Sequence, residues 1–552
     1  MYIKEHNLII NCLQIIFCYI GEYILKSNIK LEIIVLITLS ILFTFSPVIS
    51  SILLLNARNN EAISEYRLDF NLDNENPKIS ALSEKIHIAN NWSDAKAAKI
   101  CTGNGTYSEP YVIEDLVIDG GGSGSCILIE NSDVYFKIKN CTVYNLLGSN
   151  NTGIKLFNAN NGNLTNNNCS NNIRGIFLDI SYNNTVSGNI ASGGHYGIYL
   201  RHCNNNTISG NTVSNNGNYG IGLIDSDYNI ISGNAANNNN LAGIHLSGDN
   251  NAVSGNTVSN NSNYGIGLFD SDYNIISGNT ANNNDYVGIL LSGDNNTVSG
   301  NIANNNENAG IGLSGKYNII SGSNANYNTR YGIILRNSDN NSILGNTANN
   351  NYWDGIWLED CNNNTILGNT ANNNYWDGIC LEDCNNNIIS GNNANYNTQN
   401  GIYLSYSGNN AISGNIVSYN TQYGIHLSNR GNNAISGNTA NNNFGGISLY
   451  YSDNNAISGN IANYNPQTGI ILRNSNYNIV SGNILIGNAE CISEVNCQGN
   501  EFSDNGACTY GESEDGGGNP IELNILISVI SGVTVIGLAT LLLIRRKRKR
   551  IQ

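Results

Sequence analysis

The chain has 552 residues, of which 12% are charged, and it contains 59 glycines, 5 prolines and 1 methionine. A charged fraction about half of what is usual, with an excess of Gly and Asn, excludes an assembly of ordinary globular domains. Isoleucine and leucine recur at fixed spacing, which excludes an unstructured polar chain. The net charge of −16 disfavours binding to nucleic acid. A chain of this charge is better suited to bind neutral glycans, cations or other proteins than nucleic acid.

An apolar leader occupies residues 1–57. Its run Ile33–Leu55 follows two lysines and ends beside small residues, as the hydrophobic region of a signal peptide does. The run is also long enough to stay in a membrane as an N-terminal anchor. Either outcome exports the bulk of the chain. We expect residues 58–110 to form an N-terminal cap.

Residues 111–490 are predicted to be a repeat array, because one tetrad returns at intervals of 22 or 23 residues. The tetrad reads Gly-Ile-x-Leu, and about nine residues later comes a second motif, as in Asn206–Asn211. Apolar residues alternate at period two in both segments, which predicts short β-strands. The tetrads begin at Gly153, Gly175, Gly197, Gly220, Gly243, Gly265, Gly288, Gly310, Gly332, Gly355, Gly378, Gly401, Gly424, Gly446 and Gly469.

The predicted fold class is all-β, a parallel β-helix (a solenoid) in which each coil stacks on the next. Coils this short cannot bury their own Ile and Leu side chains, so each coil depends on its neighbours. Asparagine suits the turns, because it tolerates left-handed backbone and its stacked amides can form hydrogen-bonded ladders. A helical solenoid would need apolar stripes at helical spacing, and a leucine-rich repeat would need its own motif; neither is present.

These motifs, with the segment from Gly103 to Gly120, resemble those of right-handed parallel β-helix repeat proteins with a pectin-lyase-like fold. They are most similar to the NosD-like group and its exported archaeal relatives, over about residues 103–490. The resemblance implies right-handed coils. Its members include sugar-active enzymes, carbohydrate binders and a copper-delivery accessory protein. Copper favours His and Met ligands, but the outward-facing His245 and His426 are eight coils apart, so copper delivery stays a further alternative.

In each tetrad the Ile and Leu point inward, so x and the residue after Leu point outward. The outward residues vary, which indicates a recognition surface. Most distinctive is a doublet, residues 352–361 and 375–384, whose two copies are nearly identical. Its tryptophans can stack on sugar rings, and its carboxylates can bind hydroxyls or Ca²⁺. The candidate ligand-binding residues are Trp353, Asp354, Trp357, Glu359, Asp360, Trp376, Asp377, Glu382 and Asp383.

A weaker hypothesis is catalysis by Glu359, Glu382 and Arg336, which occupy one column in three successive coils. Two carboxyl groups about 5 Å apart suit a retaining glycosidase, and a polysaccharide lyase would need acidic residues beside a basic one. Duplicated scaffold is the plain alternative. Any duplicated coil places identical residues in columns, and Arg336 with the glutamates is then a surface ion-pair ladder.

The turns hold two more candidate features. Cys361 and Cys384 share a column at a spacing that permits a disulfide. Two Asp-Ser-Asp motifs could chelate Ca²⁺, although Asx turns explain them as well. No cofactor is assigned, and Ca²⁺ is the one that the sequence suggests. The candidate Ca²⁺ ligands are Asp225, Asp227, Asp270 and Asp272.

A C-terminal cap and an acidic, Gly-rich linker are expected over 491–524, followed by an uncharged apolar segment, Ile525–Ile544. That length spans a bilayer as a transmembrane helix. The basic tail 545–552 places the C-terminus in the cytoplasm and the bulk of the chain outside. We therefore expect a single-pass protein of the cell membrane.

The sequence thus predicts a membrane-anchored cell-surface β-helix protein. It is expected to bind carbohydrate or surface proteins through the outward face of one sheet, and no nucleic acid. The alternatives are a polysaccharide lyase or glycoside hydrolase, a structural stalk, and a NosD-like copper-site accessory protein.

Overall fold

The computed structural model describes residues 81–148 and 151–506. The predicted leader, the apolar segment 525–544 and the basic tail lie outside these residues. The helix within them is α3 (Trp92–Ala97), and no helix of the described part is long and apolar enough to cross a membrane. The predicted membrane anchor therefore stays a prediction from sequence.

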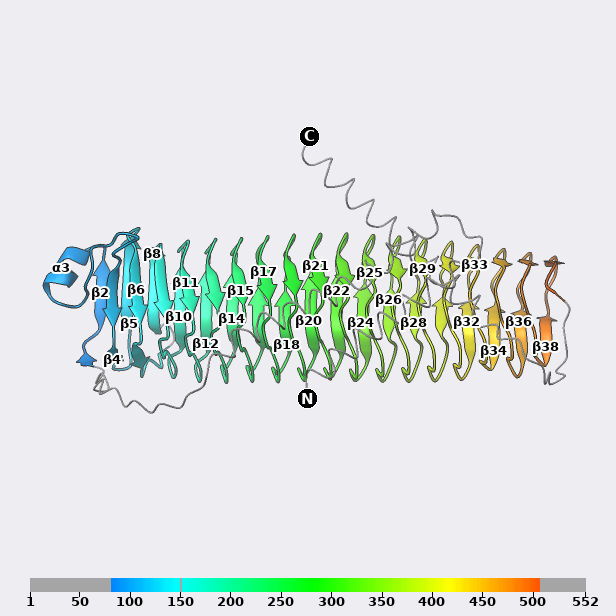
Figure 1. Ribbon diagram of the computed structural model, residues 1–552, viewed down its shortest axis with the longest axis horizontal. Helices are drawn as coiled ribbons and strands as arrows, with labels where there is room; N and C mark the ends of the chain where they lie inside the picture. Colours follow the sequence, from blue (N-terminus) through cyan, green and yellow to red (C-terminus); the bar gives the residue numbers. More distant parts are fainter. Residues whose placement is uncertain (1–80, 149–150, 507–552) are drawn as a thin grey trace, which may run out of the picture. The chain divides into compact units, whose positions relative to one another are not determined.

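The described residues form the predicted right-handed parallel β-helix, with coil stacked on coil (Figure 1). A typical coil holds a long strand, β14 (Tyr219–Ile224), a short strand, β15 (Ile230–Ser232), and a single bridged residue, Ala235. Each pairs in parallel with its equivalent in the next coil, as Leu200 does with Leu223. Residues 22 or 23 apart consequently lie side by side.

Three parallel sheets run along the stack. The first contains β2 (Ile86–Ala89), β5 (Ser125–Ser132), β8 (Thr152–Ala159), β10 (Arg174–Asp179), β12 (Tyr196–Arg201), β14, β16 (Ala242–Leu246), β18 (Tyr264–Leu268), β20 (Val287–Ser292), β22 (Ala309–Ser314), β24 (Tyr331–Arg336), β26 (Ile356–Glu359), β28 (Ile379–Glu382), β30 (Ile402–Ser405), β32 (Tyr423–Ser428), β34 (Gly445–Tyr450), β36 (Thr468–Arg473) and β38 (Glu490–Val495). The second contains β3 (Tyr111–Glu114), β6 (Phe136–Lys139), β9 (Gly162–Thr165), β11 (Thr185–Ser187), β13 (Thr207–Ser209), β15, β17 (Ala252–Ser254), β19 (Ile275–Ser277), β21 (Thr297–Ser299), β23 (Ile319–Ser321), β25 (Ser342–Leu344), β27 (Thr365–Leu367), β29 (Ile388–Ser390), β31 (Ala411–Ser413), β33 (Ala434–Ser436), β35 (Ala456–Ser458), β37 (Ile479–Ser481) and β39 (Glu501–Ser503). The third begins as β1 (Ala81–Ser83), β4 (Leu116–Asp119) and β7 (Thr142–Tyr144) and continues as single bridged residues.

The core is a continuous column of aliphatic side chains inside the coils. Ile221, Leu223 and Ile231 are fully buried, and their equivalents are buried in successive coils. Each such side chain contributes about 1.5–3 kcal/mol when it leaves water. At the N-terminal end, Trp92 of α3 is buried and stacks on Tyr111, with ring centroids 4.9 Å apart. The helix therefore covers the first coils.

Buried asparagines occupy all three corners of the coil, at Asn229, Asn234 and Asn239 in one repeat. Asn239 is representative: its Nδ2 donates to the Val213 carbonyl at 3.2 Å and to Oδ1 of Asn261 at 3.1 Å. Its own Oδ1 accepts from both nitrogens of the equivalent asparagine in the previous coil. Each amide thus satisfies backbone groups that the corner removes from the sheets.

The residue before a corner asparagine often carries the turn. Asn238 has φ of 57°, in the left-handed region, directly before the buried Asn239. Asparagine is among the residues that tolerate this backbone. The sequence predicts that asparagine adopts left-handed backbone and forms amide ladders. These two roles fall on neighbouring residues: Asn238 turns the chain, and Asn239 bonds to the adjacent coils.

The corner hydrogen bonds predict a sharp contrast between two adjacent residues. Asn239→Ala leaves a backbone N–H and a carbonyl unpaired in the interior, at roughly 1–3 kcal/mol each. Asn240 is exposed and its side chain has no hydrogen-bond partner in the described part of the chain, so Asn240→Ala is the matched control. We expect the thermal midpoint of the β-sheet circular dichroism signal to fall clearly for Asn239→Ala only. Equal midpoints for the two variants would contradict the role of the ladder.

Candidate functional site

The doublet lies on two neighbouring coils, because β26 and β28 pair in register, with Glu359 beside Glu382. Its residues do not form one patch, since the strands separate them: Trp353 and Asp354 precede β26, whereas Asp360 follows it. The doublet therefore splits into an aromatic ridge before the strands, a buried cluster beside that ridge, and an acidic edge after the strands.

The glycine that precedes each strand decides which side chains of the doublet face outward. Gly378 and Ile379 both face the core: a Cβ added at Gly378 would lie 2.7 Å from a carbonyl oxygen of the next coil, and Ile379 is fully buried. Two consecutive inward residues at the start of the strand break the alternation of side chains. Asp377 and Cys380, three residues apart, consequently share the outer face. The first copy repeats this arrangement around Gly355.

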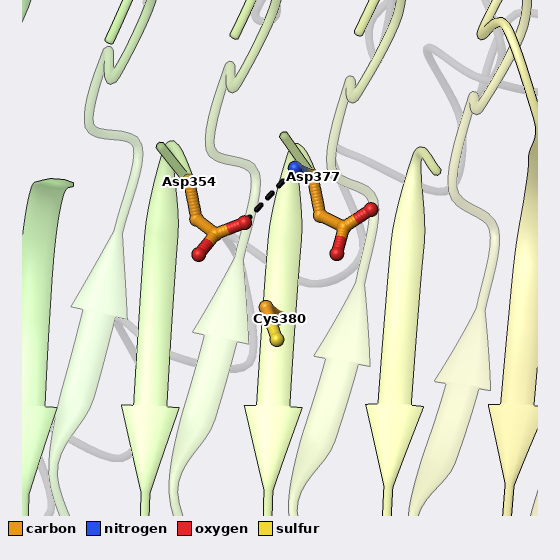
Figure 2. Close-up of side chains that lie close together, drawn as sticks. All are labelled: Asp354, Asp377 and Cys380. Atoms are coloured by element: carbon orange, nitrogen blue, oxygen red, sulfur yellow. Dashed lines mark hydrogen bonds between the residues drawn. The ribbon is translucent and has the colours of Figure 1, made fainter. Parts of the chain in front are cut away.

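Asp354, Asp377 and Cys380 form a buried group on this outer face, here called the Asp-Asp-Cys cluster (Figure 2). The residues are 2%, 4% and 6% exposed, and one oxygen of each carboxylate and the Cys380 Sγ all lie within 4.8 Å of one another. Asp354 accepts a hydrogen bond from the Asp377 backbone N at 2.9 Å. Asp377 accepts from Asn400 N at 2.7 Å and Nδ2 at 2.9 Å. Within 81–148 and 151–506, this is the one group of three potential metal ligands.

Burial shapes the acid–base behaviour of the Asp-Asp-Cys cluster. It raises the pKa of the Asp354 carboxyl well above its ordinary value, and the facing Asp377 carboxyl raises it further. Burial also raises the pKa of Asp377, against the opposing effect of the hydrogen bonds from Asn400. The pKa of the Cys380 thiol is raised by burial and then by both aspartates. Without a cation beside it, the cluster therefore favours its protonated forms.

Trp357, a predicted ligand contact, is instead a packing residue and only 7% exposed. Tyr331 stacks on it with ring centroids 4.7 Å apart, and the Arg336 guanidinium lies 4.8 Å from its ring centroid. Trp357, Tyr331, Ile334 and Cys380 belong to a second apolar cluster, separate from the core. The position faces outward as predicted, but Tyr331 and Arg336 of the preceding coil, which lie in the columns on either side of it, cover the ring.

The aromatic ridge comprises Tyr352, Trp353, Tyr375 and Trp376. Equivalent rings stack across the two coils: the centroids of Tyr352 and Tyr375 are 4.9 Å apart, and those of Trp353 and Trp376 are 5.0 Å apart. Arg330 lies 4.8 Å from the Trp353 ring centroid. Tyr352, Tyr375 and Trp376 are 57%, 52% and 39% exposed. These three rings are the accessible part of the doublet's aromatic content.

The acidic edge contains the candidate catalytic residues. Arg336, Glu359 and Glu382 occupy one column in register, and Arg336 Nε lies 2.9 Å from Glu359 Oε2. Burial, followed by the charge of Glu359, raises the pKa of Glu382. Asp360 and Asp383 are exposed beside the glutamates. Arg336 and Glu359 thus form the first step of an ion-pair ladder, and Glu382 has no cationic partner among the described residues.

The four candidate calcium ligands are dispersed. Asp227 and Asp272 each accept a hydrogen bond from the backbone N of the equivalent turn one coil on, at 2.8 and 2.7 Å. Asp225 and Asp270 are exposed. No three-ligand group forms around any of them within the described residues.

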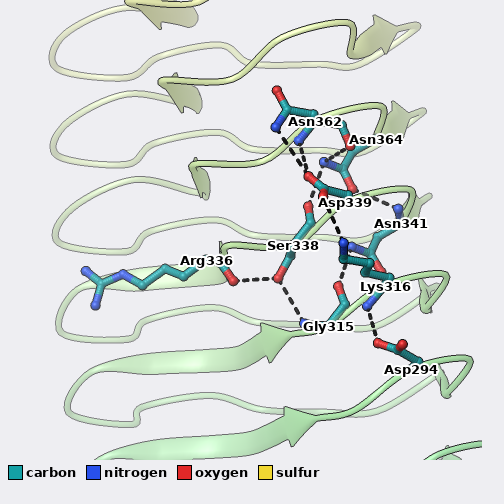
Figure 3. A network of polar contacts seen from close by, with 9 residues as sticks. All are labelled: Asp294, Gly315, Lys316, Arg336, Ser338, Asp339, Asn341, Asn362 and Asn364. Atoms are coloured by element: carbon teal, nitrogen blue, oxygen red, sulfur yellow. Dashed lines mark hydrogen bonds and ion pairs between the residues drawn. The ribbon is translucent and has the colours of Figure 1, made fainter.

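The same carboxylate ladder continues along the stack. Figure 3 shows Asp294 accepting from the Lys316 backbone N at 2.7 Å, and Asp339 accepting from the Asn362 backbone N at 2.9 Å. These carboxylates satisfy turn N–H groups across coils. These aspartates are therefore structural hydrogen-bond acceptors. They bond to a turn in the adjacent coil, whereas an Asx turn bonds to its own backbone.

The predicted disulfide between Cys361 and Cys384 is not formed, and both are buried free thiols. The Cys361 backbone N donates to Cys384 Sγ at 3.2 Å, and each thiol donates to the carbonyl oxygen two residues earlier at 3.0 Å. Ser338 and Ser407 bond in the same way in the flanking coils. The thiols thus continue a serine ladder along the stack.

Cys380 is the functional candidate that sequence reasoning missed. Strict alternation from the Gly-Ile-x-Leu tetrad places it on the outer face but puts Asp377, three residues earlier, on the inner face. The available signal is the glycine between them, because a glycine often marks close approach of another backbone. Gly378 faces inward beside Ile379, and this brings the two side chains to the same face.

Comparisons with known proteins agree with this architecture. A family model described as "Periplasmic copper-binding protein (NosD)" matches residues 102–269 and 417–531, and one described as "Right handed beta helix region" matches 276–417. No curated protein matches the chain.

Two solved structures illustrate what the chain is similar to. The Dettilon tailspike protein (gp208) has 18% identity over 53% of this chain and a TM-score of 0.34, and the chain spans 60% of that protein's length. The A-module of the Azotobacter vinelandii mannuronan C-5 epimerase AlgE4 has 14% identity, with 77% of this chain and 93% of that one covered and a TM-score of 0.29. At these identities the likenesses carry no inference about activity.

The stacked coils and their register define a right-handed parallel β-helix repeat protein. Because the NosD model matches slightly more than half of the 552 residues, the chain belongs to the NosD family.

The family description names copper, but the described residues do not fit a copper site. Copper sites gather His, Met or several Cys, whereas the Asp-Asp-Cys cluster has no His and the described residues contain no Met. His245 stacks on Tyr219 and His426 on Tyr403, with centroids 4.2 and 5.3 Å apart. Burial lowers the pKa of both imidazoles to about 4. Both are packing groups, and we assign no copper chemistry to them.

The cysteine geometry predicts a mapping result. When the full chain is unfolded in iodoacetamide without reductant, Cys361 and Cys384 should both be alkylated, because neither is cross-linked. Cleavage after Glu359 and Glu382 places them on separate peptides for mass spectrometry. Cys491 is disulfide-bonded and should stay unmodified, which serves as the internal control. A linked pair of peptides containing Cys361 and Cys384 would show that the serine-ladder assignment is wrong.

Proposed function

We propose that this chain is an extracytoplasmic β-helix that binds neutral glycan along a groove lined in part by the two tyrosines of the aromatic ridge. The groove, here called the tyrosine groove, lies over successive turns of the stack. Its lining residues are Tyr327, Asn328, Thr329, Asn350, Asn351, Tyr352, Asn373, Tyr375 and Thr398.

The composition of the tyrosine groove is the observation that carries the proposal. Every residue of its lining is a tyrosine, an asparagine or a threonine, and none is charged. Sugars present hydroxyl groups, which pair with amides and hydroxyls, and C–H faces, which pack on aromatic rings. An uncharged lining on a chain of net charge −16 favours a neutral glycan over an anionic one.

The coil repeat explains how the tyrosine rings stay available. Thr329, Tyr352, Tyr375 and Thr398 occupy the same position in four successive coils, as their equivalent backbone hydrogen bonds show. The two rings stack on each other, so each has one covered face. A small threonine stands beyond each ring instead of a third aromatic residue. The outer face of each tyrosine ring is therefore open above a threonine. A sugar ring needs such an open aromatic face for packing.

The acidic edge supports catalysis less well than the tyrosine groove supports binding. The retaining-glycosidase hypothesis needs two unhindered carboxyl groups, and Glu359 is paired with Arg336. Glu382 alone would be left as an acid. Export fits the periplasmic location named for the family, and the anchor over 525–544 belongs to the same proposal on sequence grounds.

Binding of glycans to the full chain tests the proposal. Titration with neutral polysaccharides, with uronans as the anionic contrast, is followed by calorimetry. Tyr352→Ala/Tyr375→Ala should weaken binding about fivefold or more, since each of the two ring contacts contributes about 0.5–1.5 kcal/mol. Tyr450→Ala removes a tyrosine of another coil that is 40% exposed, and should leave the affinity unchanged.

Three results would overturn the proposal: no neutral glycan binds, uronans bind better, or the double variant binds as the wild type does. Mass spectrometry of the same mixtures addresses the enzyme alternative. New oligosaccharides that vanish in Glu382→Gln would replace the binding function by hydrolysis or lyase activity.

A further inference from the structure

We infer that the Asp-Asp-Cys cluster is a binding site for one divalent transition-metal ion, of the chemistry of Zn²⁺, held between two successive coils by Asp354, Asp377 and Cys380. This inference does not depend on the proposed glycan function, because none of the three residues lines the tyrosine groove.

The first support is the convergence of three donor atoms. A carboxylate oxygen from each of two coils and one thiol sulfur lie within 4.8 Å of one another. A tetrahedral zinc ion with oxygen and sulfur ligands would hold such atoms roughly 3.3–3.6 Å apart. The donors are thus within reach of side-chain adjustment on a fixed backbone, and a water molecule would complete four ligands.

The second support is the unused bonding capacity of the cluster. Cys380 is only 6% exposed, and its thiol has no hydrogen-bond partner in the described part of the chain. Each aspartate uses one oxygen as an acceptor there, and the other oxygen makes no hydrogen bond with the described residues. The lone pairs of these oxygens and of the sulfur are therefore not used by hydrogen bonds from the described residues. A single cation could bond to all three groups at once.

The third support is the orientation of the two carboxylates by neighbouring groups. Asn400, one coil beyond Asp377, donates from both its backbone N and its Nδ2 to the same oxygen, at 2.7 and 2.9 Å. The Asp377 backbone N holds the Asp354 carboxylate in the same manner at 2.9 Å. Such outer contacts fix ligand orientation in metal sites. In Figure 2 both carboxylates lie at the start of their strands, with Cys380 further along the strand that follows Asp377.

The donor set selects the class of ion. Ca²⁺ and Mg²⁺ take oxygen ligands and leave a thiol unused. Cu⁺ prefers several soft ligands, of which the cluster has one. Zn²⁺ accepts carboxylate oxygen together with thiolate sulfur. The column of the two aspartates continues with Tyr331 on one side and Asn400 on the other. The column of Cys380 continues with Trp357 and Tyr403. The columns therefore hold one site, not a row of sites.

Cobalt(II) is the probe, because a Co²⁺–thiolate bond gives a charge-transfer band in the near ultraviolet that carboxylates do not give. The full chain, freed of metal with chelator, is titrated with CoCl₂ and then with ZnCl₂. We expect one band that saturates at one equivalent and that Zn²⁺ removes by displacement. Cys380→Ser should abolish the band.

Matched variants separate the site from the other cysteines. Cys361→Ser replaces a buried thiol by the residue that holds the same position in neighbouring coils, and should keep the band. Asp354→Asn leaves every thiol in place and should weaken Co²⁺ binding by more than about 100-fold. It therefore tests the site even if Cys380→Ser does not fold, and circular dichroism checks the fold of each variant.

Every outcome decides the matter. A band that requires both Cys380 and Asp354 establishes the site. The inference is wrong if the wild-type chain gives no band, or if the band survives undiminished in Cys380→Ser or in Asp354→Asn.

Discussion

The hydrogen bonds from a buried asparagine amide to the coils on either side are the interactions on which the rest of this structure depends. A coil that turns three corners removes backbone groups from its sheets at each corner, and a buried group without a partner is costly. Asn229, Asn234 and Asn239 satisfy those groups in one coil, and their equivalents do so along the array. Because each amide bonds to its own equivalent, the ladders permit only an in-register stack.

In-register stacking turns every sequence position into a column. A single duplicated repeat therefore produced paired tyrosines, paired tryptophans and paired carboxylates without further adjustment of the fold. The same rule turned Cys361 and Cys384 into members of a serine ladder. Whether a side chain stays accessible depends on the size of its neighbours in the adjacent coils. Tyr352 and Tyr375 are bordered by threonines, whereas Tyr331 covers Trp357.

The glycine at the start of the long strand adds a second level of control. A regular strand would send Asp377 and Cys380 to opposite faces of the sheet. The inward glycine between them cancels the alternation and brings an acid and a thiol together in an apolar setting. The tetrad glycine, which packs closely against the next coil, thereby also sets up the Asp-Asp-Cys cluster in the one described coil where both positions carry metal-binding side chains.

The sequence alone determined the fold class, the coil length, the inward Ile and Leu columns and the register of the doublet, because period-two alternation and a fixed repeat leave one way to stack the coils. It also placed Arg336, Glu359 and Glu382 in one column. Only the tertiary structure decided exposure and proximity within the doublet. Trp357 and both aspartates are buried rather than exposed, and Cys380 joins them. Burial depends on the size of the neighbours in adjacent coils, and the shared face depends on an inward glycine that a simple alternation rule does not contain.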